Sequence, residues 1–350
     1  MIDLPVLFST TADYYRFAVV ELRREADVEK VTRVGEDAGF VQLKNGGIER
    51  LHELASSGYL RFCKHFAAVE KHATTKSLEH EDAEEIAEWA FDGIATRLEA
   101  LADSGEYTPG SAISLHTWDS GQGPWAPGKV RRHLLEMLMD EGVRVVPGGA
   151  DLALSVCLGE DRVTTGVTPS RYALSDWAGG RIRLASRKDQ VSRAEFKLEE
   201  LFTHIDLPEG DVAVDLGASP GGWTRILRSR GYGVVHAVDP AGLDQRVLDL
   251  GGVEHHRTTA GEFVATFPRR VDLIVNDMRM PPQLSAHTML EASDMLNPGA
   301  TAIVTLKLGT NNPVKQADEA MNMLSEAYDI TFARQLQHNR HEITVVALRA

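Results

Sequence analysis

From Ser192 to its end, the chain alternates short apolar β-type runs with helical stretches, and this alternation constrains the fold most strongly. Sheets built this way carry helices on both faces, so the pattern predicts a doubly wound, largely parallel α/β sheet. Only four residues separate the last two runs, which is too few for a crossover helix, so we expect an antiparallel hairpin at one edge. The six expected strands are Val212–Leu216, Val234–Val238, Val271–Asp277, Thr301–Leu308, Thr331–Gln337 and Ile343–Leu348.

The first 190 residues show a different pattern and predict two smaller α+β domains. Residues 1–70 read as βαββαβ, which is a ferredoxin-like order. Residues 71–180 hold an acidic helix-forming stretch, a second helix near Lys129–Asp140 and four strands. A basic linker is expected at residues 181–191, before an α/β domain at 192–350. The strands expected in the first domain are Pro5–Thr10, Lys30–Val34, Phe40–Leu43 and Gly58–His65.

Composition excludes several classes of protein. The net charge of −14 argues against a surface coated with basic residues, although a local basic patch is compatible with it. The two cysteines, Cys63 and Cys157, cannot form a disulfide framework or a cysteine zinc cluster, and we expect no metal. No apolar run approaches the ~20 residues of a membrane span, and Met1–Pro5 do not resemble a signal peptide. We therefore expect a cytoplasmic protein, and nothing indicates its oligomeric state.

A glycine-rich turn follows the first strand of the alternating region. Glycine allows close approach of a ligand and positive φ, but the spacing is not the G-x-G-x-x-G of a dinucleotide site. Asp215 can accept hydrogen bonds from a cationic amino-acid group, and Asp239, at the next strand end, can hold a ribose diol. These features predict an S-adenosylmethionine site. The residues expected there are Asp215, Gly217, Ala218, Ser219, Pro220, Gly221, Gly222, Trp223, Asp239 and Asp277.

The same turn resembles the first motif of the FtsJ-like ribose 2′-O-methyltransferases, which carry a Lys-Asp-Lys-Glu tetrad. The segment Ser192-Arg-Ala-Glu-Phe-Lys197-Leu is similar to the family's Ser-Arg-x-x-x-Lys-Leu helix. The resemblance implies Lys197, Asp277, Lys307 and Glu342 as catalytic residues. It also implies the Rossmann-like fold of the class I methyltransferases and S-adenosylmethionine as methyl donor. No residue is assigned to the adenine amino group.

The chain further resembles the RlmM subfamily, most clearly over residues 335–345. This resemblance implies a THUMP-like RNA-binding domain at residues 71–180 and large-subunit ribosomal RNA as substrate. A ribose hydroxyl must lose its proton to attack the methyl group, and a lysine in a dry site near another cation can act as the base. We expect Lys307 to be that base, with Asp277 and Glu342 orienting it and Lys197.

Basic residues concentrate between Arg181 and Arg193, which hold five bases and one acid in an otherwise acidic chain. This basic strip is either a solvated linker or a contact to RNA phosphates. Its members are Arg181, Arg183, Arg187, Lys188 and Arg193.

Two other classes of methyltransferase require residues that this chain does not have at the corresponding positions. Methylases of exocyclic amines have prolines and an aromatic directly after the strand that ends at Asp277, and this chain does not. Cytosine-C5 methylases need a cysteine in the catalytic domain, and both cysteines precede it. A non-catalytic RNA-binding assembly factor, or a methyltransferase acting on another RNA such as tRNA, stays open. The sequence does not identify the target nucleotide, or whether free RNA or an assembling particle is bound.

Overall fold

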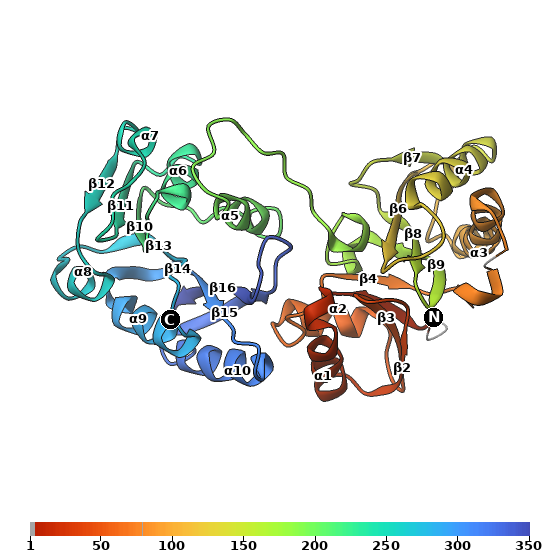
Figure 1. The fold of residues 1–350 in the computed structure, drawn as a ribbon, viewed down its shortest axis with the longest axis horizontal. Helices are drawn as coiled ribbons and strands as arrows, with labels where there is room; N and C mark the ends of the chain where they lie inside the picture. Colours follow the sequence, from red (N-terminus) through yellow and green to blue (C-terminus); the bar gives the residue numbers. More distant parts are fainter. Residues whose placement is uncertain (1–3, 79) are drawn as a thin grey trace. The chain divides into compact units, whose positions relative to one another are not determined.

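The computed structural model describes residues 4–78 and 80–350 (Figure 1). The chain divides into two compact units: one holds the residues up to Ile182 apart from Ser56–Gly58, and the other holds Ser56–Gly58 and the residues from Arg183 onward. Met1–Asp3, which belong to the N-terminal segment that does not resemble a signal peptide, lie outside the described residues. Within the described ranges, no helix combines the length and apolar character needed to cross a bilayer.

The N-terminal unit begins with a four-stranded sheet in the order β2-β3-β1-β4. All three neighbouring pairs are antiparallel. The chain order is βαββαβ, as the sequence predicted. The elements are β1 (Val6–Ser9), α1 (Tyr15–Glu25), β2 (Val28–Arg33), β3 (Ala38–Leu43), α2 (Ile48–Ser56) and β4 (His65–Ala68).

The strand expected at Gly58–His65 was wrong, because β4 starts only at His65. Residues 60–64 are buried, but side-chain hydrogen bonds hold this segment instead of a strand ladder. Glu21 of α1 accepts hydrogen bonds from the Arg61 guanidinium (2.7 Å) and the Phe62 backbone N–H (3.2 Å). An apolar run that sequence alone assigns to a strand is therefore a buried irregular segment.

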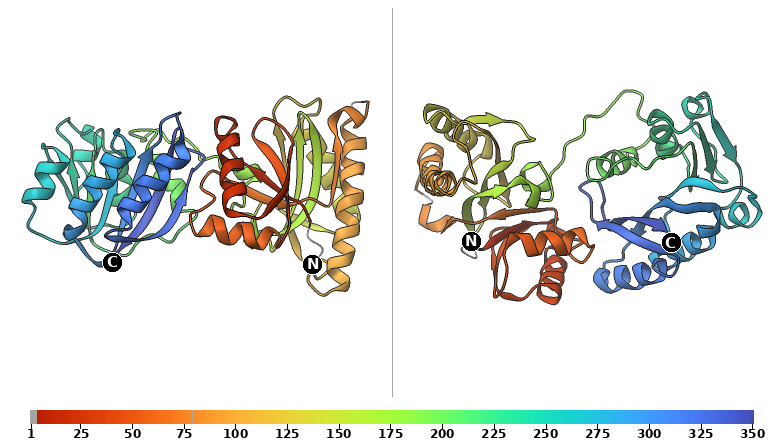
Figure 2. Two further views of the ribbon diagram at one scale, coloured as in Figure 1. Left: turned by 90° about the horizontal axis from the view of Figure 1, so that it is seen from below. Right: turned by 180° about the vertical axis from the view of Figure 1, so that it is seen from behind.

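A second sheet of the same unit has the order β5-β9-β8-β6-β7. Helix α3 begins with a capping box in which Asp82 and Glu85 bond each other's backbone. Helices α3 and α4 pack on one face of the sheet, as Figure 2 shows. The elements are β5 (Lys71–Thr74), α3 (Ala83–Asp103), β6 (Ala112–Ser120), α4 (Pro127–Asp140), β7 (Arg144–Val146), β8 (Leu152–Gly159) and β9 (Arg162–Pro169).

The two sheets of this unit share one buried core. Leu7 and Phe40 of the first sheet pack in one cluster with Trp118 and Cys157 of the second. The two predicted α+β domains are therefore joined into a single compact unit. Burying Cys157 also raises the pKa of its thiol, which suits it to packing rather than to reaction.

The C-terminal unit is built on a seven-stranded sheet in the order β12-β11-β10-β13-β14-β16-β15. Strand β16 is antiparallel to both its neighbours, and the other pairs are parallel. The mixed sheet with its edge hairpin confirms the doubly wound prediction. Its strands are β10 (Val212–Leu216), β11 (Val234–Val238), β12 (Val253–His256), β13 (Val271–Asn276), β14 (Leu296–Lys307), β15 (Tyr328–Arg334) and β16 (Glu342–Arg349).

Helices cover both faces of this sheet (Figure 1). Helices α5 (Glu195–Leu201) and α6 (Gly222–Ser229) pack on one face. Two differences from the sequence prediction affect the edges. Strand β12 was missed, and β15 ends at Arg334 rather than Gln337. The backbone N–H groups of Gln337 and His338 donate to the Glu200 carboxylate rather than to a neighbouring strand. The remaining helices are α7 (Gln245–Leu248), α8 (Ala260–Thr266), α9 (Pro282–Ala292) and α10 (Pro313–Leu324).

Candidate active site

Four side chains from four elements converge at the carboxyl ends of the central strands. Asp277 directly follows β13, and Lys307 is the last residue of β14. Strand β16 runs antiparallel to β14, so its first residue, Glu342, lies directly opposite Lys307. Lys197 reaches the same point from α5. The structure therefore brings together all four residues of the predicted tetrad.

Each ammonium group of the tetrad contacts both carboxylates. Lys197 Nζ lies 3.0 Å from both oxygens of Asp277 and 2.7 Å from Glu342 Oε1. Lys307 Nζ lies 2.6 Å from Glu342 Oε2 and also donates to Asp277 Oδ1. Two positive and two negative groups thus form a closed, charge-balanced cluster. Their side chains are only 8–20 % exposed, which strengthens the attraction between them.

Electrostatics divide the roles of these groups. Burial alone would lower the pKa of Lys197, but attraction to Asp277 and Glu342 outweighs it and raises the pKa. Burial would raise the pKa of Glu342, but the two lysines hold it below its usual value. At neutral pH, Lys197 is therefore a fixed cation and Glu342 a fixed anion.

Two neighbours of the tetrad were not predicted from the sequence. Thr305, two residues before Lys307 on the same face of β14, donates from Oγ1 to Asp277 Oδ1 at 2.6 Å. Asn339 donates from Nδ2 to Glu342 Oε1 at 3.2 Å. Both hold a carboxylate in place. The period-2 alternation of β14 was the available signal for Thr305, whereas Asn339 depends on the loop before β16.

The glycine-rich turn links β10 to α6. Gly217 and Gly221 have φ of 76° and 109°, which other residues rarely adopt. A Cβ on Gly221 would lie 2.9 Å from the Val247 side chain. The chain itself therefore requires glycine here. A Gly221→Val variant would perturb folding as well as any ligand contact.

Acids stand at the ends of two adjacent strands beside this turn. Asp215 of β10 is buried and accepts a hydrogen bond from Thr224 Oγ1 at 2.7 Å. Burial, reinforced by the negative charges of Asp277 and Asp239 and opposed by the Thr224 hydrogen bond, raises the pKa of Asp215 to about 7. Asp239, after β11, accepts backbone N–H groups from Ser219 (3.1 Å) and Ala241 (2.8 Å).

Two positions near the turn have structural partners. The Trp223 side chain is 3 % exposed, and its indole N–H donates to the Ala194 carbonyl at 2.7 Å. The side chain anchors α6 to the segment before α5, and its expected contact with the ligand stays a prediction. Glu262 accepts from Thr259 in the capping box of α8. This exposed acid is thus used at a helix start.

The structure divides the basic strip. Arg181 donates to Asp37 Oδ2 (2.7 Å) and Asp119 Oδ1 (2.8 Å), so it links the two sheets of the N-terminal unit. Arg187 pairs with the buried Glu199. Both arginines thus have structural partners, and their expected contacts with phosphate stay predictions. The exposed members are Arg183, Lys188 and Arg193, besides Arg187 itself.

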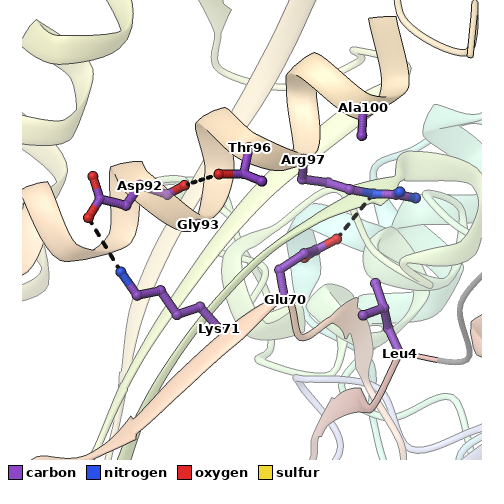
Figure 3. Close-up of a pocket in the computed structure, with 8 residues that line it drawn as sticks. All are labelled: Leu4, Glu70, Lys71, Asp92, Gly93, Thr96, Arg97 and Ala100. Atoms are coloured by element: carbon purple, nitrogen blue, oxygen red, sulfur yellow. Dashed lines mark hydrogen bonds and ion pairs between the residues drawn. The ribbon is translucent and has the colours of Figure 1, made fainter. Parts of the chain in front are cut away.

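A hollow of about 470 Å³ lies in the N-terminal unit between α3 and the start of β5 (Figure 3). Its cations have acidic partners, because Lys71 pairs with Asp92 (3.5 Å) and Arg97 with Glu70 (3.3 Å). The hollow therefore does not extend the basic strip.

The parallel sheet, the glycine turn and the Lys-Asp-Lys-Glu cluster together define a methyltransferase-type α/β domain. A family model described as FtsJ-like methyltransferase matches residues 190–338. This part of the chain is an FtsJ-like methyltransferase domain.

Relatives carry the comparison further. The chain is 39 % identical over 182 residues to Ribosomal RNA large subunit methyltransferase M of Halorhodospira halophila, covering 49 % of this chain and 51 % of that one. The protein of the same name from Methylococcus capsulatus is 36 % identical over 192 residues, covering 49 % and 53 %. The matched segment thus spans about half the length of these curated relatives. The crystal structure of TrmN from Thermus thermophilus is similar with 14 % sequence identity and a TM-score of 0.39, and the match covers 99 % of this chain and 100 % of that one.

Proposed function

We propose that this protein transfers a methyl group from S-adenosylmethionine to a ribose 2′-hydroxyl of large-subunit ribosomal RNA, in the cytoplasm. The observation that carries the proposal is the closed tetrad of Lys197, Asp277, Lys307 and Glu342 beside the glycine-rich turn. The names of the relatives support the choice of RNA.

The residues present fit the methyl donor. Asp215 offers a buried carboxylate for a cationic amino-acid end, and Asp239 offers oxygens for a ribose diol. The turn from Gly217 to Gly222 follows the strand of Asp215, and its Ser219 backbone N–H donates to Asp239, so the turn lies beside both acids. When bound there, S-adenosylmethionine supplies a methyl group on a positively charged sulfur.

The tetrad prepares the nucleophile. Lys197 stays protonated and can hold the ribose oxygen while neutralising the charge that develops on it. Lys307 acts as the base in its neutral amine form: after its ammonium has released a proton to solvent, Nζ takes the proton of the 2′-hydroxyl. Asp277 and Glu342 hold the two lysines in one place, so the gain comes from positioning as well as from proton transfer.

The direct test is a methyl-transfer assay with labelled S-adenosylmethionine and large-subunit RNA from cells that lack the protein. We expect one label per RNA, located at a 2′-hydroxyl by mapping. A protein that binds this RNA without labelling it would be an assembly factor. Label on tRNA alone would keep the chemistry and overturn the substrate.

The N-terminal unit supports a role in choosing the RNA. We propose that residues 1–70 form a ferredoxin-like domain, since their strand order and antiparallel pairing fit that topology. We assign residues 71–180 as THUMP-like, 181–191 as the linker and 192–350 as the catalytic domain. The separation of the chain near Ile182 supports this last boundary.

Reversing three exposed bases of the strip should weaken RNA binding and its salt dependence. Each lost phosphate contact lowers the slope of log K against log salt by about 0.7–0.9, so Arg183→Glu/Lys188→Glu/Arg193→Glu should lower it by roughly 2–3. Filter binding at several salt concentrations measures this. Lys315→Glu on α10, also exposed, is the matched control. An unchanged slope would show that the strip is only a linker.

The affinity for S-adenosylmethionine should fall as the pH drops below about 7. The pKa of Asp215 is raised to about 7, so acidification protonates the carboxylate that faces the cationic ligand, at a cost of up to about tenfold per pH unit. Above the pKa the affinity should level off. Calorimetric titration between about pH 6 and about pH 8 tests this. Asp215→Asn should remove most of the pH dependence, and a slope retained in that variant would assign it to another group.

A further inference from the structure

Two histidines and a glutamate lie close together at the β12 edge of the seven-stranded sheet. The tetrad lies at other strands of this sheet, β13, β14 and β16. His236 lies on β11, and Glu254 and His256 lie on the edge strand β12. In the parallel register, His236 is opposite Glu254, and His256 is two residues further along the same face. Among the described residues, this is the group whose ligand atoms all lie within 4.8 Å of one another.

The distances between the three ligand atoms match a metal site. His236 Nδ1 lies 3.1 Å from His256 Nε2 and 3.2 Å from Glu254 Oε2, and the last two atoms are 4.0 Å apart. A tetrahedral Zn²⁺ with bonds of about 2.0–2.1 Å places its ligand atoms about 3.3–3.5 Å from one another. Two of the observed distances, 3.1 and 3.2 Å, are slightly shorter than this range, and the third, 4.0 Å, is longer.

Hydrogen bonds among the three ligand atoms cannot make both contacts of His236 Nδ1 favourable, whereas a cation between the atoms can. If His236 Nδ1 carries no proton, it accepts from His256 but faces the Glu254 carboxylate with its lone pair. If it carries a proton, it donates to Glu254 but cannot accept from His256. A cation between the three atoms is attractive to all of them at once.

Phenylalanine rings pack against both histidine rings on the buried side of the cluster. The His256 ring packs 4.8 Å from Phe263, and the His236 ring 4.8 Å from Phe267. The exposed fraction rises from 4 % for His236 to 56 % for Glu254, which leaves one side open to solvent.

We propose that His236, Glu254 and His256 bind a Zn²⁺ ion, with water as its fourth ligand, and that the ion fastens the edge strand β12 to β11. Two imidazoles and one carboxylate are a ligand set that Zn²⁺ uses in proteins. The ion has a structural role and takes no part in methyl transfer. The inference therefore stands independently of the proposed function.

The test uses the full chain, stripped with a chelator and titrated with Zn²⁺ against a chromophoric indicator. We expect one ion per chain, an increase in thermal unfolding temperature on binding, and a tetrahedral absorption spectrum with Co²⁺. Glu254→Gln, at the exposed ligand, should weaken binding by at least about tenfold, in line with the loss of one charged ligand. His256→Gln should do the same.

The matched control is His287→Gln on α9, which removes an exposed histidine paired with Glu291 at 3.4 Å. This variant should bind Zn²⁺ like the parent protein. The proposal is overturned if the parent binds no stoichiometric Zn²⁺ at micromolar concentration. It is also overturned if folded Glu254→Gln and His256→Gln bind as tightly as the parent, or if His287→Gln alone abolishes binding.

Discussion

Lys307→Arg should lower the single-turnover rate of methyl transfer by about 10²–10⁴-fold, the range expected for loss of a positioned base. The guanidinium of arginine stays protonated and cannot accept the proton of the 2′-hydroxyl. It nevertheless keeps a positive charge between Asp277 and Glu342, which the structure shows to be the partners of Lys307. Affinity for S-adenosylmethionine should therefore change by only a few-fold.

Lys307→Ala should lose activity to a similar extent, but it tests the base less cleanly. The structure shows that it would leave two buried carboxylates with Lys197 as their shared cation. Some loss of stability is expected, because an uncompensated buried charge is expensive.

The measurement is a single-turnover assay on the native RNA, with cofactor affinity and thermal unfolding recorded for each variant. Lys315→Arg on α10, whose side chain is 69 % exposed, serves as the control and should behave like the parent. If Lys307→Arg methylates RNA within a few-fold of the parent rate, Lys307 is not the base. Its role would then be electrostatic.

Asp239→Ala should weaken S-adenosylmethionine binding by about 10–100-fold. A hydrogen bond to a charged group contributes about 1.5–3 kcal/mol, and about 1.4 kcal/mol corresponds to a tenfold change in affinity. The Asp239 carboxylate also accepts the backbone N–H groups of Ser219 and Ala241, so its removal loosens the turn as well. Asp239→Asn keeps one acceptor and should show an intermediate loss.

Calorimetric titration of the folded variants measures this effect. Asp249→Asn, at an exposed acid bonded to Gln245, should leave the affinity unchanged. If the dissociation constant of Asp239→Ala stays within about two- to threefold of the parent value, Asp239 does not belong to the assigned site. Such a change corresponds to less than about 1 kcal/mol. This variant is a sharper probe than Gly221→Val, because φ of 109° at Gly221 makes any side chain there strained.

The alternation of apolar strands and helices was sufficient to predict the doubly wound sheet and its edge hairpin. Both follow from local periodicity and from connection length, which the sequence contains directly. The four tetrad residues were identified one by one through the resemblance to the FtsJ-like family, and three of them also lie at strand ends. Strand ends in an open α/β sheet are where ligands bind, whatever the details of packing.

Contacts between residues far apart in the sequence determined the surroundings of the tetrad and the role of Arg181. The register of β14 against β16 places Glu342 opposite Lys307, and the same region supplies Thr305 and Asn339 as supports of the carboxylates. The partners of Arg181, Asp37 and Asp119, lie more than 60 positions away, so composition alone could not separate a structural arginine from an RNA contact.

The histidine–glutamate cluster shows the same division. His236, Glu254 and His256 carry no motif, and the sequence led us to expect no metal. Strand β12 is short and only partly buried, so its apolar signal was too weak to predict. Local sequence identified most of the strands, because periodicity and turn residues act over a few positions, but it missed β12 and extended a strand over Gly58–His65. Only the tertiary structure determines which strands become neighbours, because that choice depends on burying the whole sheet between its two layers of helices.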